Sequence, residues 1–156
     1  MIKYRFAKRE DTDKILEFIK ALAEYEKMSD LVVATEKELE KQLFDDKKAE
    51  VIFALDGETE VGFALFFSNF STFVGKAGLY LEDLFVFPGY RGKGYGKGLL
   101  KVLASIAVER NAGRFEWCCL DWNTPSIDFY LSCGAKKMDG WTTFRLDGKA
   151  LEDFSK

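Results

Sequence analysis

The sequence predicts one α/β domain, residues 1–156, in which a mixed β-sheet is covered by helices on both faces. Strand-like apolar or alternating segments are interspersed with segments whose apolar residues recur at helical spacing. A strand, a turn and a helix over residues 79–112 are followed by another strand, as in a β-α-β unit. The length of 156 residues suits one sizeable core and is too short for two ordinary domains.

The chain begins with one strand and two helices. Residues 2–6 alternate well enough for a strand, and residues 11–13 offer N-caps for a helix that runs to about Lys27. Residues 35–38 read Thr-Glu-Lys-Glu, which is a capping box. We therefore expect a second, short helix to begin there.

Three strands should follow. Residues 51–55 are apolar and end in a turn, and residues 61–69 alternate large apolar side chains with smaller or polar ones. Residues 68–75 are a plausible hairpin connection. The segment 79–87 is longer and more apolar, as expected of a central strand that is covered on both faces.

The second half alternates helix and strand. Residues 94–112 have the pattern of a strongly amphipathic helix, and residues 115–120 read as a buried strand. A further helix should begin with Thr124 as its N-cap and end at Gly134. The segment 141–146 is predicted to be the last strand.

The composition excludes several classes of function. The net charge is −3 and the pI is 5.2, so the basic face that nonspecific nucleic-acid binding needs is not favoured. The acidity reflects either solubility or a local acidic site for a cationic substrate. Histidine is absent, which removes Ser-His-Asp and Cys-His pairs and every histidine-ligated metal site. We expect no metal, and acid–base chemistry from other side chains or water.

The cysteines and the apolar runs indicate a cellular location. Cys118, Cys119 and Cys133 are odd in number and form no C-x-x-C motif, which argues against a disulfide framework and for a reducing compartment. The N-terminal residues lack the apolar run of a secretory signal, and no segment approaches the length of a membrane span. We expect a cytoplasmic protein with no membrane partner.

The main functional signal is a glycine-rich turn at residues 91–98, Arg-Gly-Lys-Gly-Tyr-Gly-Lys-Gly, between an apolar strand and a helix. Helix N-termini have unpaired N–H groups and partial positive charge, so they bind phosphates. Glycines let the backbone approach a bulky anion, and Arg91, Lys93 and Lys97 add charge. The turn is predicted to hold an anion, although a flexible loop with solvated lysines would have the same composition.

Two common phosphate-binding motifs do not fit this turn. The P-loop motif needs Ser or Thr after Gly-Lys, whereas Lys93 and Lys97 are each followed by glycine. The dinucleotide motif G-x-G-x-x-G needs a third glycine where Leu99 stands.

Residues 91–96 resemble the acetyl-CoA motif [Q/R]-x-x-G-x-[G/A] of the GNAT superfamily of N-acetyltransferases at every defined position. Ala-Glu-Tyr-Glu-Lys at 23–27, Tyr-Leu-Glu-Asp at 80–83 and Leu-Asp-Trp-Asn at 120–123 are similar to the diamine (spermidine/spermine) and thialysine acetyltransferases of that superfamily. The likeness covers nearly the whole chain. It implies a mostly antiparallel sheet, a splayed parallel strand pair that holds the cofactor, and a homodimer.

The resemblance implies acetyl-CoA as co-substrate. The turn would grip the pyrophosphate, the backbone of residues 84–86 would hydrogen-bond the pantetheine arm, and two residues near 123–126 would contact the arm from its other side. The implied cofactor-binding residues are Leu84, Phe85, Val86, Arg91, Gly92, Lys93, Gly94, Tyr95, Gly96, Lys97, Asn123 and Ser126.

Catalysis should involve one carboxylate and one phenol. Two acids inside an apolar strand are costly to bury unless they are paired or used, and on a strand Glu82 and Asp83 point to opposite faces. The resemblance suggests Glu82 as the base, acting directly or through water, and Tyr130 as the acid for the leaving CoA thiolate. Asp83 is either a substrate contact or a structural acid. Transfer would be direct, within a ternary complex.

The substrate should be a small-molecule amine. The implied substrate residues form an acidic, aromatic-edged groove suited to a diamine or a lysine-like side chain: Tyr25, Glu26, Glu82, Asp83, Glu116, Trp117 and Asp139. Asp139 stands where relatives can carry a longer acid, which leaves polyamine and thialysine both open. Acetylation of an aminoglycoside, or of a protein N-terminus or lysine, also stays open. So does a non-catalytic role as an acyl-CoA sensor.

Overall fold

The computed structural model describes residues 1–156. It contains five strands and five α-helices: β1 Lys3–Phe6, α1 Thr12–Tyr25, α2 Glu36–Glu40, β2 Glu50–Asp56, β3 Thr59–Ser71, β4 Lys76–Val86, α3 Tyr95–Glu109, β5 Phe115–Trp117, α4 Thr124–Ser132 and α5 Gly148–Phe154. Short 3-10 turns cover Arg9–Asp11, Ser29–Leu31 and Pro88–Tyr90, and a π-helical turn covers Lys41–Asp45. None of the helices has the length and apolarity that a membrane crossing requires.

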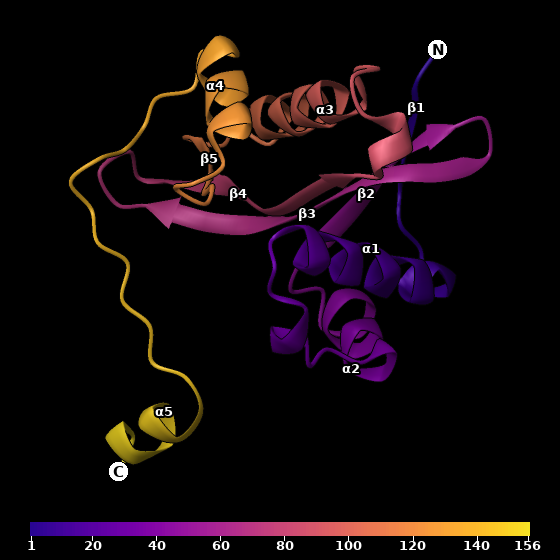
Figure 1. The fold of residues 1–156 in the computed structure, drawn as a ribbon. Helices are drawn as coiled ribbons and strands as arrows, with labels where there is room; N and C mark the ends of the chain where they lie inside the picture. Colours follow the sequence, from indigo (N-terminus) through magenta and orange to yellow (C-terminus); the bar gives the residue numbers. More distant parts are fainter. The chain divides into compact units, whose positions relative to one another are not determined.

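The chain divides into two compact units, Met1–Cys118 and Cys119–Lys156. The first unit holds the whole sheet, in the order β1-β2-β3-β4-β5 (Figure 1). Neighbouring strands from β1 to β4 are antiparallel, and β4 and β5 are parallel. The predicted mixed sheet is therefore confirmed, whereas the single acetyltransferase domain stays a prediction.

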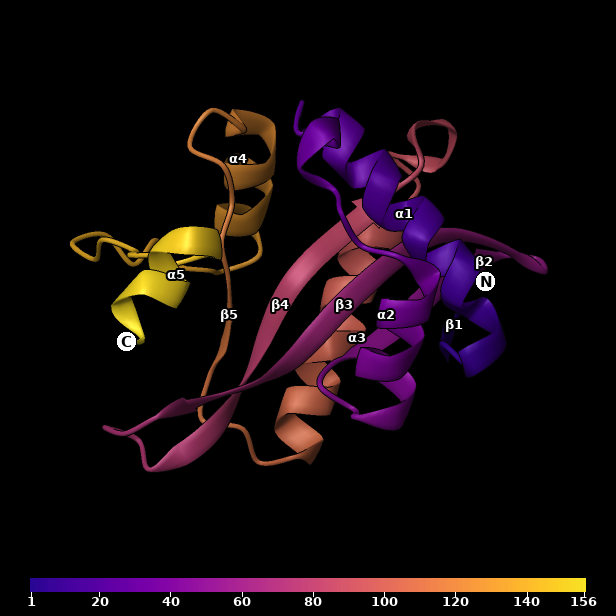
Figure 2. The same cartoon turned by 90° about the horizontal axis from the view of Figure 1, so that it is seen from below.

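One face of the sheet is covered by α1 and α2 (Figures 1 and 2). Alternation places every second side chain of a strand on this face, and the apolar stripe of α1 meets these side chains. Phe18 of α1 is fully buried and lies 5.0 Å from the ring of Phe63 and 5.8 Å from that of Phe53. The core on this face comprises Ile15, Phe18, Leu43, Val51, Phe53, Leu55, Phe63 and Phe85.

The opposite face is covered by α3 (Figures 1 and 2). Leu99 and Leu103 of α3 are fully buried there. A side chain at Gly62 of β3 would lie 3.1 Å from Val86 and 3.4 Å from Leu99, so the absence of a Cβ lets α3 pack closely on the strands. The prediction of helices on both faces of the sheet is therefore confirmed.

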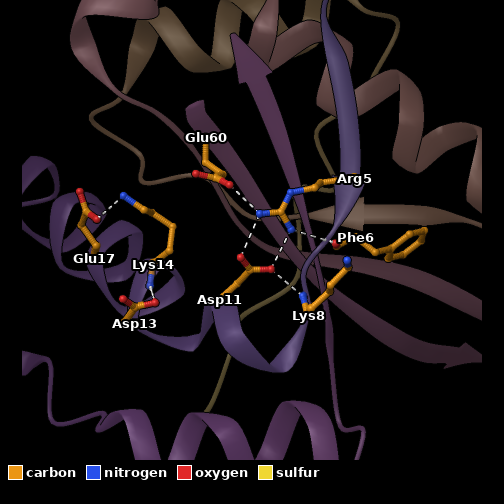
Figure 3. A network of polar contacts seen from close by, with 8 residues as sticks. All are labelled: Arg5, Phe6, Lys8, Asp11, Asp13, Lys14, Glu17 and Glu60. Carbon is orange, nitrogen blue, oxygen red and sulfur yellow. Dashed lines mark hydrogen bonds and ion pairs between the residues drawn. The ribbon is translucent and has the colours of Figure 1, made fainter. Parts of the chain in front are cut away.

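A polar network joins β1 to the start of α1 and to β3 (Figure 3). Arg5 donates hydrogen bonds to both carboxylate oxygens of Asp11, at 2.7 and 2.9 Å, and to Glu60 Oε1 at 2.5 Å. Its guanidinium also lies 5.1 Å from the ring centroid of Phe53. The Asp11 carboxylate accepts a further bond from the backbone N–H of Lys8, and the Arg5 hydrogen bond lowers the pKa of Asp11. One guanidinium thus neutralises two poorly exposed carboxylates.

Arg5→Met should lower the free energy of unfolding by about 2–3 kcal/mol, because it leaves the carboxylates of Asp11 and Glu60 without their cation. These side chains are only 14% and 19% exposed. Because the pKa of Asp11 is lowered in the folded state, the loss should be complete at neutral pH and should shrink as the pH falls through that lowered pKa. Urea titrations at several pH values would measure it.

Arg9→Met is the matched control for this prediction. Arg9 also bridges two acids, Glu40 and Asp45, but all three side chains are about half exposed. Exposed ion pairs contribute little to stability. An equal effect of the two substitutions would show that the Arg5 network is no more important than a surface ion pair.

The second unit contains α4 and α5, and here the sequence prediction is wrong in two places. Residues 141–146 form no strand; α5 follows them instead. A strand needs a neighbour for its backbone groups, and residues 141–146 have none in this structure. At the start of α4, the N-cap is Asn123, so Thr124 is the first helical residue and not the cap.

Two other elements differ in length from their predictions. The strand predicted over residues 115–120 ends at Trp117, where its pairing with β4 ends. The helix predicted from residue 35 is short and passes into the π-helical turn, although Thr35 Oγ1 does accept a 3.2 Å hydrogen bond from the N–H of Glu38, as half of the predicted capping box.

Candidate active site

A β-bulge in β4 lies at the first of the two predicted acids. Leu65 of β3 pairs with Asp83, and the next residue, Phe66, pairs with Leu81. Glu82 is therefore the extra residue and has no partner on β3. Bulges turn a side chain away from its regular direction and are frequent beside active sites. Glu82 is exposed, whereas Asp83 is partly buried.

Just beyond the bulge, β4 continues without β5. The parallel pairing joins residues 79–81 of β4 to residues 115–117 of β5 and ends there. Residues 83–86 of β4 thus pair with β3 alone. This is the opening expected of a splayed strand pair, and it contains Leu84, Phe85 and Val86, the residues predicted to bind the pantetheine arm.

The glycine turn has the backbone that an anion site requires. Gly92 and Gly94 have φ values of +76° and +93°, in the left-handed region that favours glycine. Gly94 is the N-cap of α3, a helix of 15 residues, and no side chain caps its N-terminal N–H groups. No heavy atom lies within 4 Å of a Cβ built on Gly92. The turn therefore has the open backbone and the helix N-terminus that the predicted pyrophosphate contact requires.

The side chains of the glycine turn differ in their exposure and in their contacts with the rest of the chain. Lys93 and Lys97 are exposed, and Lys93 Nζ lies 5.4 Å from the ring centroid of Tyr90. Tyr95 is buried, with only 7% of its surface exposed, so its side chain is not presented to a ligand in solution. Arg91 lies against aromatic rings and donates a 2.8 Å hydrogen bond from Nε to the backbone oxygen of Val86.

Three acids in the first unit lie close enough to interact. Burial raises the pKa of Asp83 to about 6, and the charges of Glu82 and Glu26 act in the same direction. Burial also raises the pKa of Glu26, which directly follows Tyr25 at the end of α1. An ammonium group that entered this cluster would be attracted by its carboxylates.

The predicted substrate residues of β5 have other partners. The carboxylate of Glu116 forms a 2.7 Å ion pair with Arg114 and accepts a 3.4 Å hydrogen bond from Asn69. The ring of Trp117 lies 4.9 Å from that of Phe115. Arg114, which sequence reasoning missed, thus offsets the charge of Glu116. The sequence does contain a sign of this pair: Arg114 and Glu116 are two residues apart, and residues two apart on a strand share a face.

The second unit carries the remaining predicted residues. Asn123 is buried and is the N-cap residue of α4, while Ser126 and Tyr130 are both partly buried along the helix. Positions three and seven residues after Asn123 lie on one face of a helix, so these three side chains can act together. Asp139 is exposed and lies in a turn beyond α4.

The structure has a cavity of about 480 Å³ in a different place from these residues. It lies between the π-helical turn and the ends of β1, β2 and β3, and it contains none of the predicted site residues. Its lining comprises Phe6, Ala7, Leu43, Phe44, Lys47, Lys48, Ala49, Glu50, Val51, Phe67 and Ser68.

Residues 11–135 match the model of the acetyltransferase (GNAT) family. The chain belongs to this family. It is an N-acetyltransferase, which confirms the resemblance drawn from the motifs.

Several members of the GNAT family are similar to this chain over most of its length. Thialysine N-epsilon-acetyltransferase of Sus scrofa is 36% identical over 163 residues, with 97% of this chain and 95% of the relative covered. L-ornithine N5-acetyltransferase of Arabidopsis thaliana is 40% identical over 116 residues, with 74% of this chain and 48% of the relative covered. A solved integron cassette protein from V. cholerae has a TM-score of 0.83 and 28% identity, with 99% and 98% covered.

Proposed function

We propose that this GNAT enzyme transfers the acetyl group of acetyl-CoA to the terminal primary amine of a small cationic substrate, foremost a lysine-like amino acid. The observation that most supports this proposal is the cluster of Glu26, Glu82 and Asp83, beside the point where the pairing of β4 with β5 ends. An ammonium group would relieve the repulsion among these acids, which is why we assign the cluster to the amine.

Acetyl-CoA supplies the activated acetyl thioester when it is bound. The glycine turn would hold its pyrophosphate through the main chain at Gly92 and Gly94, with charge from the exposed lysines 93 and 97. The open side of residues 84–86 would receive the pantetheine arm, and Asn123 and Ser126 are proposed to contact the same arm. The φ values of the glycines and the uncapped start of α3 support this assignment.

Proton transfer is assigned to two residues. Only a neutral amine attacks a thioester, whereas a free alkylamine has a pKa near ~10 and arrives protonated. Glu82 would accept that proton, directly or through a water molecule. As the N–C bond forms and the C–S bond breaks, the phenol of Tyr130 would give its proton to the departing thiolate. The nitrogen would lose its second proton, directly or through water, to the Tyr130 phenolate, which restores the phenol and leaves the neutral amide. Transfer is direct, with no acyl-enzyme.

The choice of amine rests on the relatives. Their names specify thialysine and L-ornithine, which are both amino acids with a primary amine at the end of the side chain. A polyamine is the second candidate, because a relative similar to spermidine/spermine N(1)-acetyltransferase is 32% identical over 162 residues. These amino acids carry a carboxylate beside their α-ammonium, whereas a polyamine has no carboxylate, so the two classes can be separated directly.

A panel of amines with acetyl-CoA, read by thiol release, tests the function. Thialysine, ornithine and lysine should be acetylated with a higher kcat/KM than spermidine, tobramycin or a protein N-terminal peptide. A preference for spermidine would move the assignment to polyamines. Tight CoA binding without turnover on any amine would identify an acyl-CoA sensor and reject the proposal.

Tyr130→Phe should lower kcat by about 10²-fold or more, since general-acid catalysis typically contributes that much. Its affinity for acetyl-CoA should stay close to that of the wild type, because only the hydroxyl is removed. Phe129→Leu, which changes the neighbouring aromatic residue on α4, is the control. Unchanged turnover in Tyr130→Phe would remove this residue from the mechanism.

Glu82→Gln should lower kcat/KM most at low pH. Below neutral pH nearly all the amine is protonated and the base is needed, whereas at high pH more free amine is present. Initial rates from about pH 6 to about pH 10 would show the loss narrowing as the pH rises through the amine's pKa. An equal loss at every pH would instead indicate that Glu82 positions the amine.

We further propose that the enzyme is a cytoplasmic homodimer and that residues 1–156 act as one catalytic domain. The basis is the likeness to the diamine and thialysine branch. Light scattering on the purified chain would test the dimer, and a monomer that is fully active would contradict it.

A further inference from the structure

Arg91 of the glycine turn lies against the end of α1. Its guanidinium carbon is 4.9 Å from the ring centroid of Tyr25 and 5.0 Å from that of Phe85. The hydrogen bond from Nε to the oxygen of Val86 fixes the guanidinium to the end of β4. A guanidinium this close to an aromatic face is attracted by the ring quadrupole. Arg91 therefore joins the turn to the last residue of α1.

The rings beneath Arg91 continue into the core. The rings of Tyr25 and Phe85 are 6.3 Å apart, and Phe85 meets Phe87 edge-on at 5.8 Å. Phe87 stacks on the fully buried Phe18 at 4.5 Å. Tyr25 is the exposed end of this series, with 39% of its surface accessible. The core thus provides a rigid base for Phe85, and Tyr25 is the outermost ring of the series.

The same rings are next to the acids that would receive the amine. Glu26 directly follows Tyr25, and its charge contributes to the raised pKa of Asp83. Phe85 follows Asp83 by two residues on β4, so the two side chains share a face of the strand. A change in the position of Tyr25 would therefore change the surroundings of both acids.

We propose that Arg91 is a positioning residue that couples the binding of the two substrates. A phosphate at the glycine turn would hold the guanidinium, and the guanidinium would hold Tyr25 and the end of α1 beside Asp83. The proposal rests on the proposed function, because it needs acetyl-CoA at the turn and an amine at the acids.

The chemistry of arginine allows both contacts at once. A guanidinium has five N–H donors in a planar fork, and the bond to Val86 uses only Nε. A phosphate contact uses the Nη groups in the plane of the fork, whereas the aromatic rings use its flat face. Binding of acetyl-CoA at the glycine turn would thus order the amine site without a large movement. By linkage, the amine must raise the affinity for acetyl-CoA by the same factor as acetyl-CoA raises the affinity for the amine.

Amide hydrogen exchange tests this coupling without the amine. The N–H groups of Glu26 and Met28 bond to the carbonyls of Leu22 and Ala23, at 2.9 and 2.8 Å, and so report on the end of α1. Saturating CoA should slow their exchange at least about threefold in the wild type. Unchanged exchange with CoA bound would overturn the coupling and leave the proposed function intact.

Three variants assign the effect to Arg91. Arg91→Met and Tyr25→Leu should each abolish the slowing at CoA concentrations that saturate the variant. Tyr90→Leu is the matched control, because Tyr90 lies under Lys93 in a similar contact on the same turn. It should keep the slowing. Slowing that survives in Arg91→Met would overturn the role of Arg91. Failure of CoA to bind the wild type would reject the proposed function, and this inference with it.

Steady-state kinetics provide a second readout. With thialysine as the amine, its KM should fall as acetyl-CoA rises in the wild type. In Tyr25→Leu the KM should be higher and independent of acetyl-CoA. A residue that only contacts the amine would raise the KM and leave its dependence on acetyl-CoA unchanged, which would contradict the coupling.

Discussion

Asp83→Asn should stabilise the fold at neutral pH and weaken the enzyme. The free energy of unfolding at pH 7 should rise by about 2–3 kcal/mol, because the folded chain holds this carboxyl with a pKa of about 6. Burial is the main cause, and the charges of Glu82 and Glu26 add to it. Urea denaturation of both proteins would measure the difference.

The pH dependence of this effect has a definite sign. In the unfolded chain Asp83 ionises near its ordinary pKa of 3.8, and in the folded chain near 6. Between these two pH values Asp83 keeps its proton in the folded state and has lost it in the unfolded state. The contribution of Asp83 to the free energy of unfolding therefore falls as the pH rises. Above the folded pKa the loss is complete. The gain from Asp83→Asn should therefore appear between about pH 4 and pH 6 and vanish below about pH 3.

The same substitution should raise the KM for the amine by about tenfold or more, since the proposed charge-assisted contact between Asp83 and the ammonium would be lost. Glu82→Gln makes the same charge change at an exposed neighbour and should not stabilise the fold comparably. No change in stability at pH 7 in Asp83→Asn would show that the folded chain does not disfavour the Asp83 carboxylate.

The strand, turn and helix from β4 to α3 could be predicted because their signals are local. An apolar run, a glycine-rich turn and a helical stripe follow one another within residues 76–109. The two left-handed glycines lie where the motif requires backbone approach, at Gly92 and Gly94. The cofactor side of the candidate site therefore follows from the sequence with little help from tertiary structure.

Features that depend on distant partners were harder to predict. The bulge at Glu82 arises from the register between β3 and β4, which the sequence of β4 alone does not specify. Residues 141–146 were predicted to form a strand from their own sequence, but a strand also needs a neighbour. The contact of Arg91 with Tyr25 joins residues far apart in the chain. The sequence shows the charge of Arg91 but not this second contact.

Gly94→Val should lower the affinity for CoA by about 10²-fold or more, while most of the fold remains. Gly94 caps α3 with a φ of +93°, which a β-branched residue adopts only at a cost of about 1–2 kcal/mol. The chain would relieve that strain by changing the turn, and the N–H groups at the start of α3 would no longer point to one place. Calorimetric titration with CoA would measure the affinity, and circular dichroism would verify the fold.

Gly57→Val separates the loss of the anion site from backbone strain. Gly57 also has a left-handed φ, +61°, and no heavy atom lies within 4 Å of a Cβ built there. It lies in the turn between β2 and β3, far along the chain from the glycine turn, so it should lose similar stability and keep its affinity for CoA. If both variants bound CoA like the wild type, the glycine turn would not be the phosphate site. If both variants lost affinity for CoA equally, the loss would reflect unfolding. Only a loss of affinity confined to Gly94→Val would assign the pyrophosphate to the start of α3.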